Sequence, residues 1–121
     1  MNLKPPTPTL RSFDQTKAIA FYIDFLGFKI DWTHRFTEDA PRYQQLSRSA
    51  CIIHLSEHHG DGTPGTKIRI PCDDLDTYLA ELTAKDYKYY NPSIVEQSWN
   101  DREMSITDPF GNTLIFFQPV E

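Results

Sequence analysis

The chain has 121 residues, of which 39% are hydrophobic and 24% are charged, and its formal net charge is −5. This length and composition predict one globular domain with a single core. The acidic balance argues against nucleic acid, because proteins that bind it present a basic surface. No apolar run approaches the roughly 20 residues of a membrane-spanning helix, and the N-terminus lacks the apolar core of a signal peptide. We therefore expect a cytoplasmic protein with no nucleic-acid partner and no membrane partner.

The first elements of the chain are predicted to be an arm, a short strand and a helix. Pro5, Pro6 and Pro8 favour an extended arm, because proline cannot donate to a helix or a central strand. A short strand over residues 9–13 follows. Asp14 suits the N-cap of the next helix, and Gly27 suits the position just after its end. The predicted inner face of this helix consists of Ala18, Ile19, Tyr22, Phe25 and Leu26.

From Phe28 the pattern changes to a period of two, which is typical of a strand. One face of this strand is predicted to carry Phe28, Ile30, Trp32, His34 and Phe36. The other face is predicted to carry Lys29, Asp31, Thr33 and Arg35. Two more strands, over residues 42–48 and 50–56, complete a βαβββ unit.

The second half of the chain predicts the same order of elements. A strand over residues 67–72 precedes a helix capped by Asp73 or Asp74, and strands follow over residues 94–97, 102–107 and 113–118. The helix is predicted to bury Leu75, Tyr78, Leu79 and Leu82. We therefore expect one domain, residues 1–121, made of module one (about 7–56), a polar linker (57–65) and module two (about 66–118).

Two signatures of the chain together resemble those of the vicinal oxygen chelate superfamily of glyoxalases, bleomycin-resistance proteins and dioxygenases. One is the helix end at residues 21–28. The other is the C-terminal hairpin, in which Trp99 and Arg102-Glu103 precede the turn Asp108-Pro109-Phe110-Gly111-Asn112. The resemblance covers nearly the whole chain and is strongest to metal-free bleomycin-resistance proteins. It implies an α+β fold whose two βαβββ modules form a concave cleft with helices on the outer faces.

The resemblance also predicts where a metal would bind. Metal enzymes of the superfamily hold one divalent ion with His, Glu or Gln, and the equivalent positions fall at about Thr7, His54, Lys67 and Ile115. Only His54 is a ligand of that kind. We therefore expect no metal, no cofactor and no catalytic residue. The residues favour a binding protein over an enzyme, and a glyoxalase-like metal enzyme with displaced ligands stays open as an alternative.

Strand alternation predicts which side chains face the cleft. The predicted ligand-binding residues are Trp32, Phe36, His54, Arg69, Trp99, Ile115 and Phe117. Competing interpretations treat Trp32 and Phe36 as core or dimer-interface aromatics and His54 as a core histidine with satisfied hydrogen bonds. In bleomycin binders, aromatic residues that stack on the drug lie in the strand that carries Arg69 here.

The resulting hypothesis is a metal-free homodimer that sequesters a flat or amphipathic small molecule, with a bleomycin-type antibiotic as one candidate. The proline arm is expected to reach the partner subunit. A module for an anionic metabolite, favoured by Lys67 and Arg69, is a further alternative.

Overall fold

The computed structural model describes residues 1–88 and 90–120 of the chain. The fold is α+β with two βαβββ modules, so the predicted fold class is confirmed. The chain divides into two compact units, Met1–Pro64 and Gly65–Glu121. The predicted strands agree with the observed ones to within two residues at each end.

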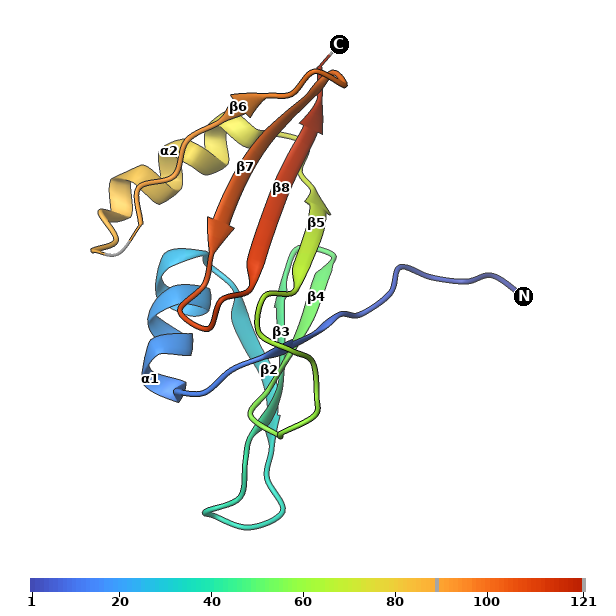
Figure 1. The fold of residues 1–121 in the computed structure, drawn as a ribbon, viewed down its shortest axis with the longest axis vertical. Helices are drawn as coiled ribbons and strands as arrows, with labels where there is room; N and C mark the ends of the chain where they lie inside the picture. The colour runs from blue at the N-terminus through green and yellow to red at the C-terminus, as the bar shows by residue number, and fades with distance from the viewer. Residues whose placement is uncertain (89, 121) are drawn as a thin grey trace. The chain divides into compact units, whose positions relative to one another are not determined.

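The first unit is a four-stranded sheet with one helical segment (Figure 1). Its elements are β1 (Thr9–Arg11), α1 (Gln15–Ala18), η1 (Ile19–Phe25), β2 (Lys29–His34), β3 (Tyr43–Arg48) and β4 (Cys51–Ser56). The strands are ordered β1-β4-β3-β2. The β1–β4 pair is parallel and the other two pairs are antiparallel.

The second unit repeats this topology. Its elements are β5 (Lys67–Pro71), α2 (Leu75–Lys85), β6 (Val95–Glu96), β7 (Asp101–Thr107) and β8 (Thr113–Pro119). The strands are ordered β5-β8-β7-β6, with β5 and β8 parallel. The predicted repetition of elements is therefore confirmed.

The helix of the first unit begins as predicted but continues with wider turns. The Asp14 side chain accepts a hydrogen bond from the Lys17 backbone N–H, 3.1 Å away, as an N-cap does. From Ile19 onward the helix is a π-helix, in which the Leu26 N–H bonds the Phe21 carbonyl at 2.9 Å. The wider turn places Phe21 in the core together with the predicted Ala18, Tyr22, Phe25 and Leu26, whereas the predicted Ile19 is only partly buried. The predicted inner face was incomplete, because it assumed 3.6 residues per turn throughout.

Each sheet buries one face against its own unit's helix. In the first unit Ile53 and Leu55 lie on the buried face, as predicted, and the core there also contains Leu10, Phe21, Tyr22, Phe25 and Leu46. In the second unit the core contains Leu75, Leu82, Met104, Ile106, Leu114 and Phe116. The opposite face of each sheet carries most of the side chains that were predicted to bind a ligand.

The simple alternation predicted for β2 is wrong, because a β-bulge interrupts the strand. Ile30 lies opposite Leu46 on β3, but Trp32 lies opposite Gln45, so Asp31 is an extra residue. A bulge of one residue moves every later side chain to the other face. Ile30 therefore lies on the face that Leu46 shares with the core, whereas Trp32 and His34 lie on the opposite face.

The faces of β5 and β8 follow the prediction. Arg69 lies opposite Ile115, and Pro71 lies opposite Phe117. Ile68 and Ile70 lie opposite Leu114 and Phe116, on the core side. Arg69, Ile115 and Phe117 therefore share the face of the second sheet that turns away from the core.

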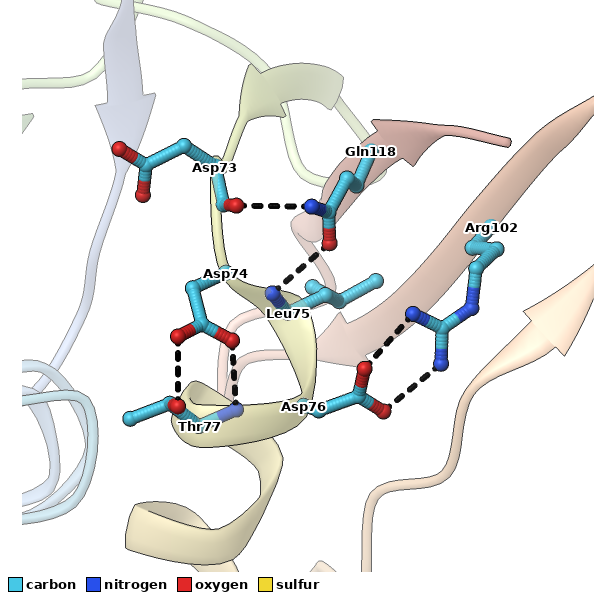
Figure 2. A network of polar contacts seen from close by, with 7 residues as sticks. All are labelled: Asp73, Asp74, Leu75, Asp76, Thr77, Arg102 and Gln118. Atoms are coloured by element: carbon cyan, nitrogen blue, oxygen red, sulfur yellow. Dashed lines mark hydrogen bonds and ion pairs between the residues drawn. The ribbon is translucent and has the colours of Figure 1, made fainter. Parts of the chain in front are cut away.

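Polar contacts fix the start of α2 against the second sheet (Figure 2). Asp74 is the N-cap and accepts from the Thr77 N–H at 3.1 Å and from the Thr77 hydroxyl at 2.7 Å. The Thr77 hydroxyl is the main cause that lowers the pKa of Asp74. Gln118 of β8 accepts from the Leu75 N–H at 3.0 Å. Arg102 of β7 donates both guanidinium nitrogens to Asp76, at 2.8 and 2.9 Å, and this lowers the pKa of that carboxyl.

The turn between β7 and β8 has the backbone conformation and the hydrogen bonds that its residues predict. Gly111 adopts a φ of 90°, which favours glycine. The buried Asp108 carboxylate accepts from the Phe110 and Asn112 backbone N–H groups at 2.8 Å and from the Asn112 side-chain amide at 2.9 Å. The Asp108 side chain therefore adds three hydrogen bonds to a turn that is also closed by the Asp108 N–H, which bonds the Asn112 carbonyl at 2.8 Å.

The linker after β4 packs on β1. A Cβ added to Gly62, whose φ is 72°, would lie 2.9 Å from the Thr9 carbonyl oxygen, whereas a Cβ added to Gly60, with φ 95°, would meet nothing within 4 Å. Both substitutions strain the backbone, but only Gly62→Ala also forces the loop off the strand. We expect Gly62→Ala to lower the free energy of unfolding by about 1–3 kcal/mol more than Gly60→Ala does. Urea denaturation of both variants measures the difference, and equal losses would contradict the close packing.

Candidate ligand-binding site

The face of the first sheet that turns away from the core, here called the open face, gathers polar and aromatic side chains from all four strands. Strand register defines its members as Thr9 and Arg11 of β1, Lys29, Trp32 and His34 of β2, Tyr43, Gln45 and Ser47 of β3, and Ile52, His54 and Ser56 of β4. Two of the predicted ligand-binding residues, Trp32 and His54, thus lie on one face.

Three rings form a cluster near the middle of the open face. Trp32 stacks on Tyr43 with ring centroids 6.1 Å apart and planes within 13° of parallel. The His54 ring meets Trp32 edge-on at 5.4 Å and Tyr43 edge-on at 5.2 Å. Trp32 remains 43% exposed, so the interpretation of Trp32 as a core aromatic is wrong. The cluster presents ring surface that a flat ligand could cover.

Hydrogen bonds hold His54 at both ring nitrogens. Its Nδ1 lies 2.8 Å from the Tyr43 hydroxyl, and its Nε2 lies 3.0 Å from Oε1 of Gln45. The Tyr43 hydroxyl is also 3.3 Å from the Thr9 hydroxyl. His54 is therefore satisfied by its neighbours, as the core interpretation required, but it lies on the open face and is only partly buried.

Asp31, the extra residue of the β2 bulge, lies at the end of the hydrogen-bond network around His54. It accepts from the Gln45 amide at 3.0 Å and from the Ser47 hydroxyl at 2.9 Å, with the Lys29 ammonium 3.9 Å away. The Gln45 hydrogen bond, followed by that from Ser47, holds the pKa of Asp31 below its usual value. The carboxylate is therefore ionised at neutral pH and can only accept hydrogen bonds.

Phe36 lies in a second aromatic group, at the end of β2. It is 79% exposed, so it is not a core residue either. Its ring has edge contacts with His34 at 4.9 Å and His58 at 6.4 Å. The loop that carries Phe36 is held by a 2.9 Å hydrogen bond from Arg35 Nε to the Ala40 carbonyl.

In the second unit, Arg69 lies among acidic and aromatic partners. Its guanidinium forms ion pairs with Glu103 at 2.8 Å and Asp101 at 3.1 Å. It also lies over the Phe117 ring, 4.4 Å from the centroid, and faces Ile115 across the β5–β8 pair. The two carboxylates outweigh the single positive charge of Arg69, which weakens the case for an anion site here.

Trp99 lies in the loop between β6 and β7. The loop is closed by the Gln97 N–H, which bonds the Asp101 carbonyl at 2.7 Å, and Asn100 has a φ of 65°. Trp99 is 59% exposed, so a core role is excluded.

The structure groups the predicted ligand-binding residues within each unit. It brings Trp32 together with His54 in the first unit, and Arg69 together with Ile115 and Phe117 in the second.

The residues that hold His54 and Arg69 by hydrogen bonds and ion pairs, directly or through Gln45, were not among the predicted ligand-binding residues. They are Asp31, Tyr43, Gln45, Asp101 and Glu103. The alternation of β3, in which Tyr43 and Gln45 alternate with Gln44 and Leu46, was a usable signal for two of them.

The strand register shows which residues lie beside the predicted metal positions His54 and Ile115. His54 lies opposite Thr9 rather than Thr7, and Ile115 lies opposite Arg69 rather than Lys67. Neither change adds an imidazole or a carboxylate. Across residues 1–88 and 90–120, no three His, Cys, Asp or Glu side chains converge as a metal site requires. In the same part of the chain, no helix is long and apolar enough to cross a membrane.

The two βαβββ modules place the chain among α+β proteins that are built from two modules with one sheet each. The chain matches the glyoxalase superfamily over residues 2–121 and belongs to that family. It is 27% identical to a bleomycin resistance protein of Geobacillus stearothermophilus, over 94% of this chain and 96% of that protein.

Solved structures agree with this assignment. A bleomycin-binding protein from bleomycin-producing Streptomyces verticillus, in complex with copper(II)-bleomycin, is 25% identical, with 96% of each chain covered and a TM-score of 0.69. A glyoxalase-related enzyme from Clostridium phytofermentans is 20% identical, with 99% of this chain and 98% of that one covered and a TM-score of 0.75. The second likeness concerns the fold alone.

Proposed function

We propose that the chain is a metal-independent, cytoplasmic small-molecule-binding protein that sequesters a flat or amphipathic ligand as a homodimer. The observation that carries this proposal is the exposed ring cluster of Trp32, Tyr43 and His54. Large exposed rings are costly to leave in water, and a ring held by its neighbours loses little freedom when a ligand covers it.

The polar groups beside these rings support recognition by stacking. Both nitrogens of His54 already have partners within the protein. Arg69 is paired with two carboxylates, so its charge is not a strong attraction for an anionic metabolite. A ligand would therefore gain more from covering ring surface than from new hydrogen bonds to His54 or Arg69. The other predicted contacts, Phe36, Trp99, Ile115 and Phe117, would add further apolar surface.

The family relatives suggest the first ligand to try. The curated relative is described as a bleomycin resistance protein, and one solved relative holds copper(II)-bleomycin. In this chain, the predicted metal positions Thr7, Lys67 and Ile115 lack imidazole and carboxylate groups. Metal-free bleomycin is therefore a suitable first probe, because its binding would not need a metal on the protein or on the drug.

The function is tested by titrating the protein with metal-free bleomycin while following tryptophan fluorescence. The chain has two tryptophans, Trp32 and Trp99, and both are exposed. We expect saturable quenching at one ligand per chain. No response up to high micromolar bleomycin would remove this drug from consideration. Stoichiometric divalent metal in protein purified without a tag or chelator would instead favour a metal enzyme.

The N-terminal arm supports the dimer proposal. Residues 1–8 belong to no helix or strand, and Leu3 is almost fully exposed. Figure 1 shows the arm running away from the sheet of its own unit. An arm stiffened by prolines loses little entropy when it docks on a partner.

Deletion of residues 1–6 is expected to shift the protein from dimer to monomer in sedimentation velocity. This deletion spares Pro8, whose carbonyl accepts from the His54 N–H at 2.9 Å, so β1 keeps its pairing. Circular dichroism of the shortened protein serves as the folding control. An unchanged dimer would contradict a role of the arm in assembly.

A further inference from the structure

A continuous chain of hydrogen bonds crosses the first sheet. It runs from Thr9 on β1 to Tyr43 on β3, then to His54 on β4, back to Gln45 on β3, and ends at Asp31 on β2. Every strand of the sheet contributes at least one member. The hydrogen bonds run through the ring cluster, because Tyr43 and His54 belong to both.

The ionised carboxylate at one end gives the chain a direction. Asp31 can only accept, so the Gln45 amide must turn its NH₂ group toward Asp31 and its oxygen toward His54. That oxygen can only accept, so neutral His54 must carry its proton on Nε2. Nδ1 is then an acceptor, the Tyr43 hydroxyl donates to it, and the Thr9 hydroxyl can donate to Tyr43.

We propose that Gln45 is the positioning residue of the binding face. Its amide carries the influence of Asp31 to His54, selects the Nε2–H tautomer and fixes the ring plane against which Trp32 and Tyr43 pack. Fixing the rings before a ligand arrives removes part of the entropy cost of binding. The expected effect of Gln45 on ligand binding rests on the proposed function. The tautomer of His54 does not depend on any ligand and can be measured without one.

Other charged and titratable groups face the same sheet surface. On β1 this is Arg11, on β2 they are Lys29, Asp31 and His34, and on β3 it is Tyr43. The linker adds Asp61, which accepts from the Ser56 hydroxyl at 2.9 Å. Asp31 is linked to His54 through the Gln45 amide, so residue 45 joins the two groups in one hydrogen-bond network.

The direct test changes the group that faces Nε2. In a Trp99→Phe background, Trp32 is the single tryptophan and lies beside His54, and protonation of an adjacent imidazole quenches indole fluorescence. Gln45→Glu places a carboxylate at the same distance, so we expect the midpoint of the Trp32 pH titration to rise by about one unit or more. His54→Gln should remove this titration step and so assigns it. A midpoint that does not move in Gln45→Glu would overturn the proposal.

The tautomer is measured separately by ¹⁵N NMR of histidine-labelled protein at neutral pH. We expect a protonated Nε2 and an unprotonated, hydrogen-bonded Nδ1 for His54 in the wild type. A protonated Nδ1 would overturn the proposal. A purely structural role of Gln45 would change stability but would leave the tautomer of His54 unchanged in Gln45→Met, which removes the acceptor facing Nε2.

The effect on a ligand is measured by calorimetry with metal-free bleomycin and with Trp99 intact. Gln45→Met keeps the length of the side chain but removes the acceptor, and we expect roughly three- to tenfold weaker binding. Gln15→Met on α1 is the matched control and should leave the affinity unchanged. Undiminished affinity in Gln45→Met would overturn the positioning role. If the wild type itself does not bind, the proposed function fails with this drug, and the titration and tautomer alone decide the role of Gln45.

Discussion

Replacing Trp32 with alanine is expected to weaken the binding of metal-free bleomycin roughly 30-fold or more, equivalent to about 2 kcal/mol. Trp32 contacts both other members of the ring cluster, Tyr43 and His54. It is also 43% exposed, so a ligand can still cover a large part of the indole. Tryptophans with this combination of fixed neighbours and coverable surface are common binding hot spots. Isothermal titration calorimetry measures the loss.

Two comparisons make the Trp32 result specific. Trp32→Phe keeps an aromatic ring and should lose much less affinity than Trp32→Ala. Trp99→Ala removes an exposed ring from the second unit, in the loop between β6 and β7. If Trp99→Ala abolishes binding while Trp32→Ala leaves it intact, the ligand lies on the second unit and the open face is not the binding surface.

Replacing Asp108 with alanine is expected to lower the free energy of unfolding by about 3 kcal/mol. The carboxylate is buried and accepts hydrogen bonds from Phe110 N–H, Asn112 N–H and the Asn112 side chain. Removing it leaves these donors in the turn without their acceptor, and water reaches buried groups poorly. Equilibrium urea denaturation measures the change.

Asp39→Ala is the matched control for Asp108→Ala, because Asp39 is an exposed carboxylate in a loop. Its substitution should change stability by less than about 0.5 kcal/mol. Asp108→Asn keeps one acceptor and should recover part of the loss. A loss of less than about 1 kcal/mol in Asp108→Ala would mean that the turn does not depend on this carboxylate.

Local chemistry was sufficient to predict most of the fold. Asp14 and Asp74 cap their helices because short acidic side chains reach backbone N–H groups two or three residues ahead. Gly27 and Gly111 adopt positive φ because they have no Cβ. The order of elements, the two modules and the outward face of β5 and β8 all follow from interactions among neighbours in sequence.

The predicted site was recovered only in part. Alternation of β4 correctly placed His54 on the face opposite Ile53 and Leu55. Trp32 was assigned to the same face as Ile30, which the bulge at Asp31 shows to be wrong. The role of each predicted residue in binding a ligand stays a prediction.

What the sequence by itself determined is therefore the set of helices, strands, caps and turns, since these depend on contacts within a few residues. Only the tertiary structure decided the site. The bulge that turns Trp32 toward His54 depends on how β2 pairs with β3. The link from Arg69 to Glu103 joins strands that are apart in sequence, and the link from Gln45 to His54 depends on the register in which β3 pairs with β4. Such contacts arise from strand register, which is a property of the assembled sheet and is not visible in any local pattern of residues.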